Sequence, residues 1–118
     1  MAISTTTEKN SLATKYGTDG GFGAIFTADP GTTGTATGEV TGGAPAYARK
    51  AITWSGATNG VITGSATFDV PSGTTVTYAA ICSSGTAGAA TVIDRLAITS
   101  QNFASQGQLT VNFSFTIA

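Results

Sequence analysis

The sequence predicts a mainly β protein, with a single antiparallel β-sandwich or open barrel of about six to eight strands and one short N-terminal α-helix. Apolar and polar residues alternate with a period of two in several short segments after residue 21. Turns rich in glycine separate these segments, and the chain holds 16 glycines. Only the first residues follow a helical pattern instead. We therefore expect one β-rich domain over residues 1–118, with a helical segment at 1–17 and the sandwich at 18–118.

The N-terminal segment carries the pattern of a capped helix. Thr5 is expected to cap it, with Glu8 as the reciprocal partner of a capping box. Leu12 and Tyr16 lie one turn apart and form a narrow apolar stripe. Gly17 then supplies the left-handed residue that ends the helix. Because an isolated helix of this length is marginal in water, it must dock on its own domain or on a neighbouring subunit.

The strands are expected in six segments that follow this helix. They span residues 22–28, 47–54, 60–70, 74–84, 91–99 and 109–117. The last segment is the clearest, because every second residue is apolar and the residues between carry hydroxyl or amide groups. Such alternation is typical of a half-buried antiparallel strand.

The residues that most often carry chemistry are scarce or poorly placed. The chain has no histidine, which excludes serine triads and imidazole metal sites. Asp29 and Asp69 precede "PG" and "VPSG" and are expected to form turns, and no loop has the ligand spacing of an EF-hand. Cys82 lies in an apolar run and is expected to be buried and inert. We therefore expect no enzyme, no catalytic residues, no metal site and no cofactor.

The charge content points to a protein that works in an assembly. Charged residues make up 9% of the chain, against about 25% in ordinary globular proteins. With a net charge of -1, the chain has no basic footprint for nucleic acid or an anionic membrane. No secretion signal and no membrane span is expected. A surface of threonine, serine, alanine and glycine costs little to desolvate against another protein.

The segment "GEVTGGAPAYARKAITW" places two cations side by side. On a strand, Arg49 and Lys50 point to opposite faces and cannot form one basic patch. Lys50 shares a face with Ile52 and Trp54, so its amine is expected to reach water at the end of the strand. Arg49 can form a bidentate pair with Glu39 or with an acid of a neighbour. Two readings stay open: solvated cations at the start of a strand, or Arg49 as a contact between subunits.

Three aromatic residues, Tyr47, Trp54 and Tyr78, could form a platform on which a sugar ring stacks. Trp54 falls on the same face as Ile52, however, which favours a place in the core. Tyr47 is the better candidate for an exposed contact.

Four motifs in order, "TADPGTTG", "GEVTGGAPAYARKAITW", "FDVPSGTTVTY" and "FASQGQLTVNFSF", resemble a family of small virion proteins of tailed bacteriophages, especially phages of actinobacteria. Its members are variously labelled head decoration, minor capsid, minor tail or tail fibre protein. The similarity covers roughly Leu12 to Phe115. It implies a β-rich structural subunit of the virion, with no catalytic or cofactor residues.

On this basis we expect a capsid decoration (cement) protein that binds the outer surface of the major capsid lattice and stabilises the shell. It would be made in the host cytoplasm, reside in the virion and form a homo-oligomer, because shells present symmetric sites. Contacts are expected from residues 1–16 and from the loop 32–45. The candidate contact residues are Leu12, Tyr16, Glu39, Tyr47 and Arg49.

The alternative is a minor tail or tail-fibre-associated module that binds host cell-wall glycan through Tyr47, Tyr78 or Trp54. A third possibility is a chaperone-like domain that is absent from the particle.

Overall fold

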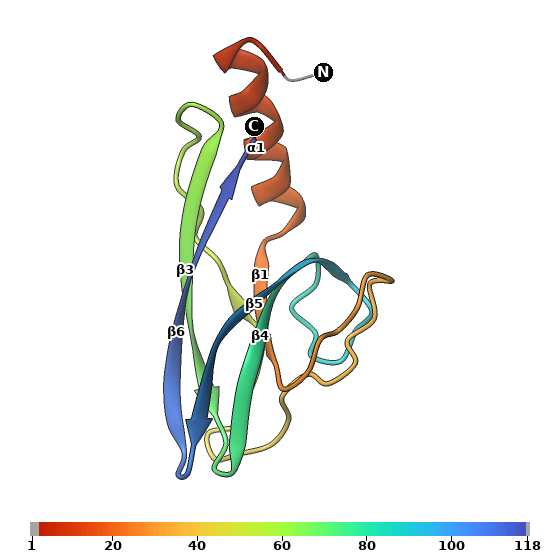
Figure 1. Cartoon of the computed structure of the whole chain (residues 1–118), viewed down its shortest axis with the longest axis vertical. Coiled ribbons are helices and arrows are strands. Elements are labelled where there is room, and N and C mark those ends of the chain that lie inside the picture. The colour runs from red at the N-terminus through yellow and green to blue at the C-terminus, as the bar shows by residue number, and fades with distance from the viewer. Residues whose placement is uncertain (1–2, 118) are drawn as a thin grey trace.

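The computed structural model describes residues 3–117 and measures 47 × 25 × 23 Å along its principal axes. One helix precedes the strands, and its long axis extends the molecule at one end (Figure 1). The elements in chain order are α1 (Thr6–Asp19), β1 (Phe22–Phe26), β2 (Lys50–Ala51), β3 (Val61–Val70), β4 (Thr74–Cys82), β5 (Val92–Phe103) and β6 (Gly107–Thr116). The prediction of a mainly β chain with one N-terminal helix is confirmed.

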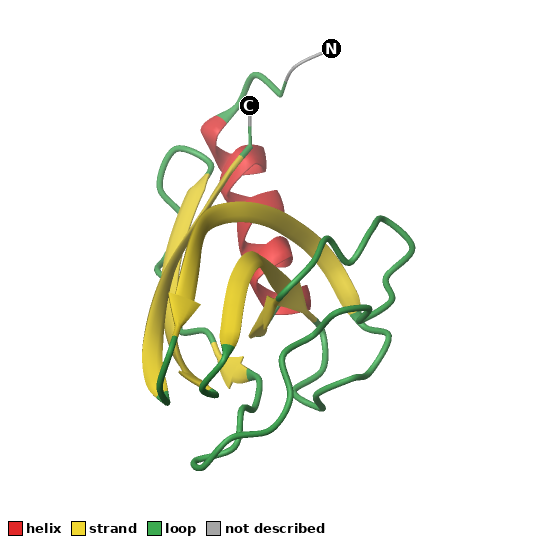
Figure 2. Cartoon of the chain, turned by 60° about the horizontal axis from the view of Figure 1, so that its bottom comes forward, coloured by secondary structure: helices red, strands yellow, loops and turns green. Residues whose placement is uncertain are grey.

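The strands form two antiparallel sheets that do not close into a barrel (Figure 2). The larger sheet has the order β2-β1-β4-β5, and the smaller one pairs only β3 with β6. The short chain between β5 and β6 crosses from one sheet to the other. The two sheets pack their apolar faces together, as the alternating sequence pattern predicts.

The core lies between the sheets. Both strands of the smaller sheet alternate as expected: Ile62, Ala66, Phe68 and Val70 of β3 are buried, while the hydroxyl residues between them are exposed or half-buried. The larger sheet supplies residues such as Ile25, Val76 and Ile81 from its inner face. Period-two alternation was therefore a reliable guide to which side chains face inward.

A second, smaller cluster lies on the other face of the larger sheet. Ala24, Phe26, Ala80 and Cys82 are fully buried there, and Ala36 of the long loop between β1 and β2 packs over them. β1 and β4 are thus covered on both faces, by the other sheet and by loops. Burial of Cys82 is confirmed, and desolvation raises the pKa of its thiol to about 11.

The helix is longer than the sequence indicated. The Thr5 side chain accepts the backbone N–H of Glu8 at 3.4 Å, so the predicted cap is correct. The predicted stop at Gly17 is wrong: α1 runs to Asp19, and the Gly20 N–H bonds to the carbonyl of Tyr16. Gly17 provides room instead, because a Cβ there would lie 3.2 Å from the Trp54 ring. The helical segment therefore ends at residue 19. No helix in the described part of the chain is both long and apolar enough to cross a bilayer.

The segment 47–54 was predicted as one strand, but only Lys50–Ala51 pairs as β2. The chain beyond β2 leaves the larger sheet and crosses to the smaller one. The Ile52 N–H bonds to Gly21 O at 2.9 Å, and the Ser55 N–H bonds to Thr63 O at 2.7 Å. This crossing connection closes one side of the sandwich.

The two expected turn aspartates behave differently. Asp29 accepts the Gly31 N–H at 2.8 Å and forms the predicted turn. Asp69 lies within β3, where its carboxylate accepts an N–H from Gln108 of β6. β3 ends at Val70, as the predicted strand 60–70 does, so Asp69 belongs to the strand and does not itself form the turn.

Candidate functional site

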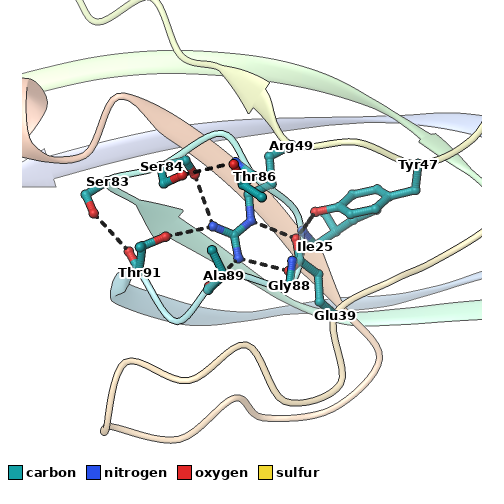
Figure 3. A network of polar contacts seen from close by, with 10 residues as sticks. All are labelled: Ile25, Glu39, Tyr47, Arg49, Ser83, Ser84, Thr86, Gly88, Ala89 and Thr91. Atoms are coloured by element: carbon teal, nitrogen blue, oxygen red, sulfur yellow. Dashed lines mark hydrogen bonds and ion pairs between the residues drawn. The ribbon is translucent and has the colours of Figure 1, made fainter.

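Three of the five candidate contact residues meet in one buried polar network (Figure 3). Arg49 faces Glu39 with two nitrogens: Nε lies 2.9 Å from Oε2, and Nη2 lies 2.9 Å from Oε1. The exposed fractions of the two side chains are 0% for Arg49 and 3% for Glu39. Glu39 is positioned by a β-bridge to Phe26 at the end of β1 and by the neighbouring bond from Val40 N–H to Ile25 O.

The remaining donors of Arg49 bind the loop between β4 and β5. Nη1 donates to Ser84 O at 3.0 Å and to Thr91 Oγ1 at 2.9 Å, and Nη2 donates to Ala89 O at 2.8 Å. A guanidinium group has five N–H donors. The five hydrogen bonds from Nε, Nη1 and Nη2 therefore give each donor an acceptor. A buried arginine is tolerated here because its charge is paired and its donors are satisfied.

Tyr47 extends the network into the core. Its hydroxyl donates to Glu39 Oε2 at 2.6 Å and accepts the Ile25 N–H at 3.3 Å. Its ring lies among the core residues, with its centroid 6.3 Å from that of Phe68. The Gly88 N–H donates to Glu39 Oε1 at 2.8 Å, which brings a further part of the β4–β5 loop to the same carboxylate.

The network changes the acidity of its members in opposite directions. Burial by itself would raise the pKa of Glu39, but hydrogen bonds from Arg49, Tyr47 and Gly88 and the positive charge of Arg49 outweigh it and hold that pKa below its usual value. Burial, together with the hydrogen bond to Glu39, raises the pKa of Tyr47 far above its usual range. The carboxylate therefore stays charged and the phenol stays neutral.

These positions correct two predictions. Tyr47, expected to be exposed, is only 7% accessible, because the β1–β2 loop turns its ring inward. Arg49 takes Glu39, one of the two partners predicted for a bidentate pair. It is neither solvated nor directed at a neighbouring subunit, the two readings left open, because the loops of its own chain bury it. The network joins the loops 27–49 and 83–91 by hydrogen bonds. Lys50 behaves as predicted, with a part-exposed amine 3.9 Å from Asp69.

The other two candidates lie on α1 and differ from each other. Tyr16 points toward the sheets, where its ring stacks on Phe115 with centroids 3.6 Å apart and its hydroxyl donates to Asp94 Oδ2 at 2.6 Å. Burial and this hydrogen bond raise the pKa of Tyr16 far above its usual range. Leu12 is 40% exposed, so the expected apolar stripe does not form one packing face. The buried residue of the helix is Ala13.

The three aromatic residues considered as a sugar platform lie in separate places. Tyr47 is in the main core, and Tyr78 packs beside the second cluster. Trp54 is half-buried at the crossing connection, and its Nε1 donates to Gly20 O at 2.8 Å. A single stacking surface built from all three is therefore not present in the described chain.

Residue type alone hardly indicates the residues that complete the network. Ser84 was expected at the end of the strand 74–84, and Gly88 and Ala89 in the stretch of small residues that follows it, and all three act through backbone groups. Backbone acceptors carry no signal in residue type. Within residues 3–117, no three metal-binding side chains of the His, Cys, Asp or Glu type lie together.

A comparison with models of known protein families gives a match to most of this chain. A family model described as podophage GP4 fiber I protein gp80 matches residues 20–115. The match begins directly after α1 and takes in both sheets. No curated protein and no solved structure matches the chain significantly.

Proposed function

Because this chain belongs to the family of the podophage GP4 fiber I protein gp80, which makes it a bacteriophage structural protein of fibre type, we propose that it is a subunit of the tail-fibre apparatus of the virion. It acts there as a bound structural module, without catalytic activity or a cofactor. The family match over residues 20–115 is the observation that carries the proposal, since it includes every strand of the sandwich.

The buried network supports a structural role. Arg49, the one fully buried cation among the described residues, holds two loops together. All of its N–H donors bind groups of the same chain, so none is left to bind a substrate. Rigid loops on a β scaffold are suited to binding because little conformational entropy is lost when a partner docks.

The helix is our candidate for attachment to another tail protein. α1 lies outside the matched residues, is mostly exposed and presents Leu12 to solvent. The expected contact segment 1–16 begins with residues 1 and 2, which lie outside the described residues. Within the expected contact loop 32–45, Val40 and Glu39 are packed inward, so only its other residues remain for a partner.

Capsid decoration remains the second candidate, with the major capsid protein as partner and the outer surface of the head as location. The exposed face of the smaller sheet favours it, because that face is rich in uncharged hydroxyl and amide groups. Such a surface costs less to desolvate against a protein lattice than a charged one.

The alternative function of a tail module is recognition of host cell-wall glycan. The residue that the sequence favoured for this contact was Tyr47. Tyr47 is buried, so a glycan would have to use Trp54 or Tyr78. Both of these are only partly exposed.

Locating and counting the protein in purified particles tests the proposal. Antibody-gold labelling at the tail, with a few to dozens of copies per virion, is expected. Labelling over the head with hundreds of copies would favour decoration instead. Absence from purified virions would overturn both and would fit a chaperone-like protein.

A further inference from the structure

The edges of the two sheets meet on two sides of the sandwich, and these two sides differ in whether another segment of the chain covers them. On one side, the crossing connection after β2 spans the gap between the sheets and bonds to Gly21 and to Thr63 of β3. On the other side, β5 is the last strand of the larger sheet and has one neighbour, β4. β6 likewise has one neighbour, β3. In Figure 1, β5 and β6 leave their shared turn at the bottom and diverge.

A groove between these two strands marks the open side. It has a volume of about 270 Å³ and is lined by Ile98, Thr99 and Gln101 of β5 and by residues 109–112 of β6. Both strand edges therefore open on the same side of the molecule. The turn at 104–106 closes one end of the groove, and Tyr16, which contacts both Asp94 of β5 and Phe115 of β6, closes the other.

The open edges lack two of the features that normally protect exposed strands, charge and proline, but β5 has a bulge between Ala97 and Gln101, where its register against β4 shifts. Natural proteins place charged residues, particularly lysine, or proline on free edges to prevent pairing with other chains. Residues 96–117 contain no charged residue and no proline. The start of β5 is covered, since the Val92 N–H bonds to Gly34 O, but Leu96 farther along is 42% exposed. The stretch without charge or proline is therefore residues 96–103 of β5, on both sides of the bulge, together with β6.

We propose that this open side is completed by a second copy of the chain, with β5 of one copy pairing with β6 of the next. Each four-stranded sheet then continues into the two-stranded sheet of a neighbour. Because both edges belong to the same chain and open on the same side, identical copies can satisfy every edge in one closed assembly, whereas an open chain of copies would leave one β5 edge and one β6 edge unpaired at its ends. Pairing of β5 with another β5 would leave every β6 edge unpaired.

Charge favours a second copy over a different partner. The uncharged β5 and β6 edges of two copies meet without like-charge repulsion, and they offer nothing to attract a strongly charged protein. Hydroxyl and amide side chains already pair between neighbouring strands within one chain: Thr67 and Thr110 join their hydroxyls at 2.8 Å across β3 and β6, and Thr75 donates to Asn102 Oδ1 at 3.1 Å across β4 and β5. Strand addition at a free edge supplies the main-chain bonds.

Light scattering coupled to size exclusion tests the pairing on the full chain. The wild-type protein is expected at a multiple of its 11.7 kDa mass. Leu96→Lys/Thr99→Lys places two charges on the β5 edge and is expected to give the mass of one chain. The control Thr53→Lys/Ser65→Lys adds the same charge at exposed sites on the closed side and on β3, and it should keep the wild-type mass.

A cross-linking experiment identifies the strands and does not depend on the lysine variants folding. Chains with Thr99→Cys and chains with Asn112→Cys are co-expressed and treated with a short bis-maleimide, while the native Cys82 thiol is buried. Cross-links between the two variants are expected. Wild-type protein at the mass of one chain, retention of the multiple by the β5 variant, or cross-links only between like variants would each overturn the pairing. A monomer could still be found on virions, so this failure is separate from failure of the proposed function.

Discussion

Arg49 and Glu39 form a two-pronged ion pair inside the protein, with both N–O distances at 2.9 Å and the side chains 0% and 3% exposed. The pair holds together loops that are far apart in the sequence, because the same guanidinium also bonds to Ser84, Ala89 and Thr91. Removal of either partner leaves a buried charge without compensation. We therefore expect the fold to be sensitive to the loss of either side chain.

Arg49→Met is expected to lower the free energy of unfolding by about 3–5 kcal/mol, the range seen when one partner of a buried pair is removed. Urea unfolding followed by tryptophan fluorescence measures the change. The matched control is Arg95→Met, because Arg95 pairs with Asp29 at 3.2 Å while both side chains are 30–44% exposed. The control should cost about 1 kcal/mol or less. Equal losses for the two variants would contradict the central role of Arg49.

Acid should weaken the fold through Glu39. Its pKa is lower in the folded protein than in the unfolded chain, so the unfolded state binds more protons. The stabilisation is fully present above the unfolded pKa of about 4.3 and is lost as the pH falls through the folded pKa. Glu39→Gln should therefore show a shallower loss of unfolding free energy below about pH 4.3 than the wild type. A slope unchanged by the substitution would show that other carboxyl groups dominate acid unfolding.

Tyr47→Phe removes a hydroxyl that bonds to both Glu39 and the Ile25 N–H. The variant leaves these buried groups short of a partner, which should cost about 1–3 kcal/mol of unfolding free energy. Tyr78→Phe is the control, since Tyr78 packs beside the second cluster and takes no part in the hydrogen bonds to Glu39 and Ile25. Thermal unfolding of both variants measures the difference, and a loss in Tyr78→Phe as large as that in Tyr47→Phe would refute the assignment.

Gly64→Ala tests how tightly the crossing connection packs on β3. A Cβ at Gly64 would lie 2.6 Å from Ile52 Cγ2 and 3.0 Å from the Thr53 carbonyl oxygen. The chain must shift to accept it, at a cost of about 1–3 kcal/mol. At Gly56, in contrast, a Cβ meets nothing within 4 Å, so Gly56→Ala should leave the unfolding midpoint nearly unchanged. Comparison of the two midpoints in urea gives the answer.

Leu12→Ala and Tyr16→Ala should separate attachment from folding. Leu12 is 40% exposed, so its truncation should change unfolding free energy by no more than about 0.5 kcal/mol. Tyr16→Ala removes the ring that stacks on Phe115 and should cost about 3 kcal/mol or more. If α1 attaches the protein to the particle, Leu12→Ala should fold normally but be depleted from virions, as measured by quantitative mass spectrometry. Normal incorporation of this variant would argue against Leu12 as a contact.

Local patterns predicted most of the elements and few of the contacts. Alternation correctly placed the core residues of β3 and β6, because side chains on a strand point to opposite faces in turn. The same argument failed for Arg49, since the chain there is not a strand and the side chain is buried by loops. Glu39 was named as one possible partner for Arg49, but the sequence offered no means of choosing it over an acid of a neighbour.

The sequence by itself determined the kind of protein this is. Its alternation required two-faced strands, its capping residues began a helix at Thr6, and its low charge content left a surface made mostly of uncharged residues. The tertiary structure alone decided that Tyr47 and Arg49 turn inward and that β5 and β6 remain open on one side. These outcomes depend on contacts between residues far apart in the chain. Such contacts form only when the loops and sheets pack against one another. Periodicity records only the environment of each residue, and so it could not reveal which distant groups meet.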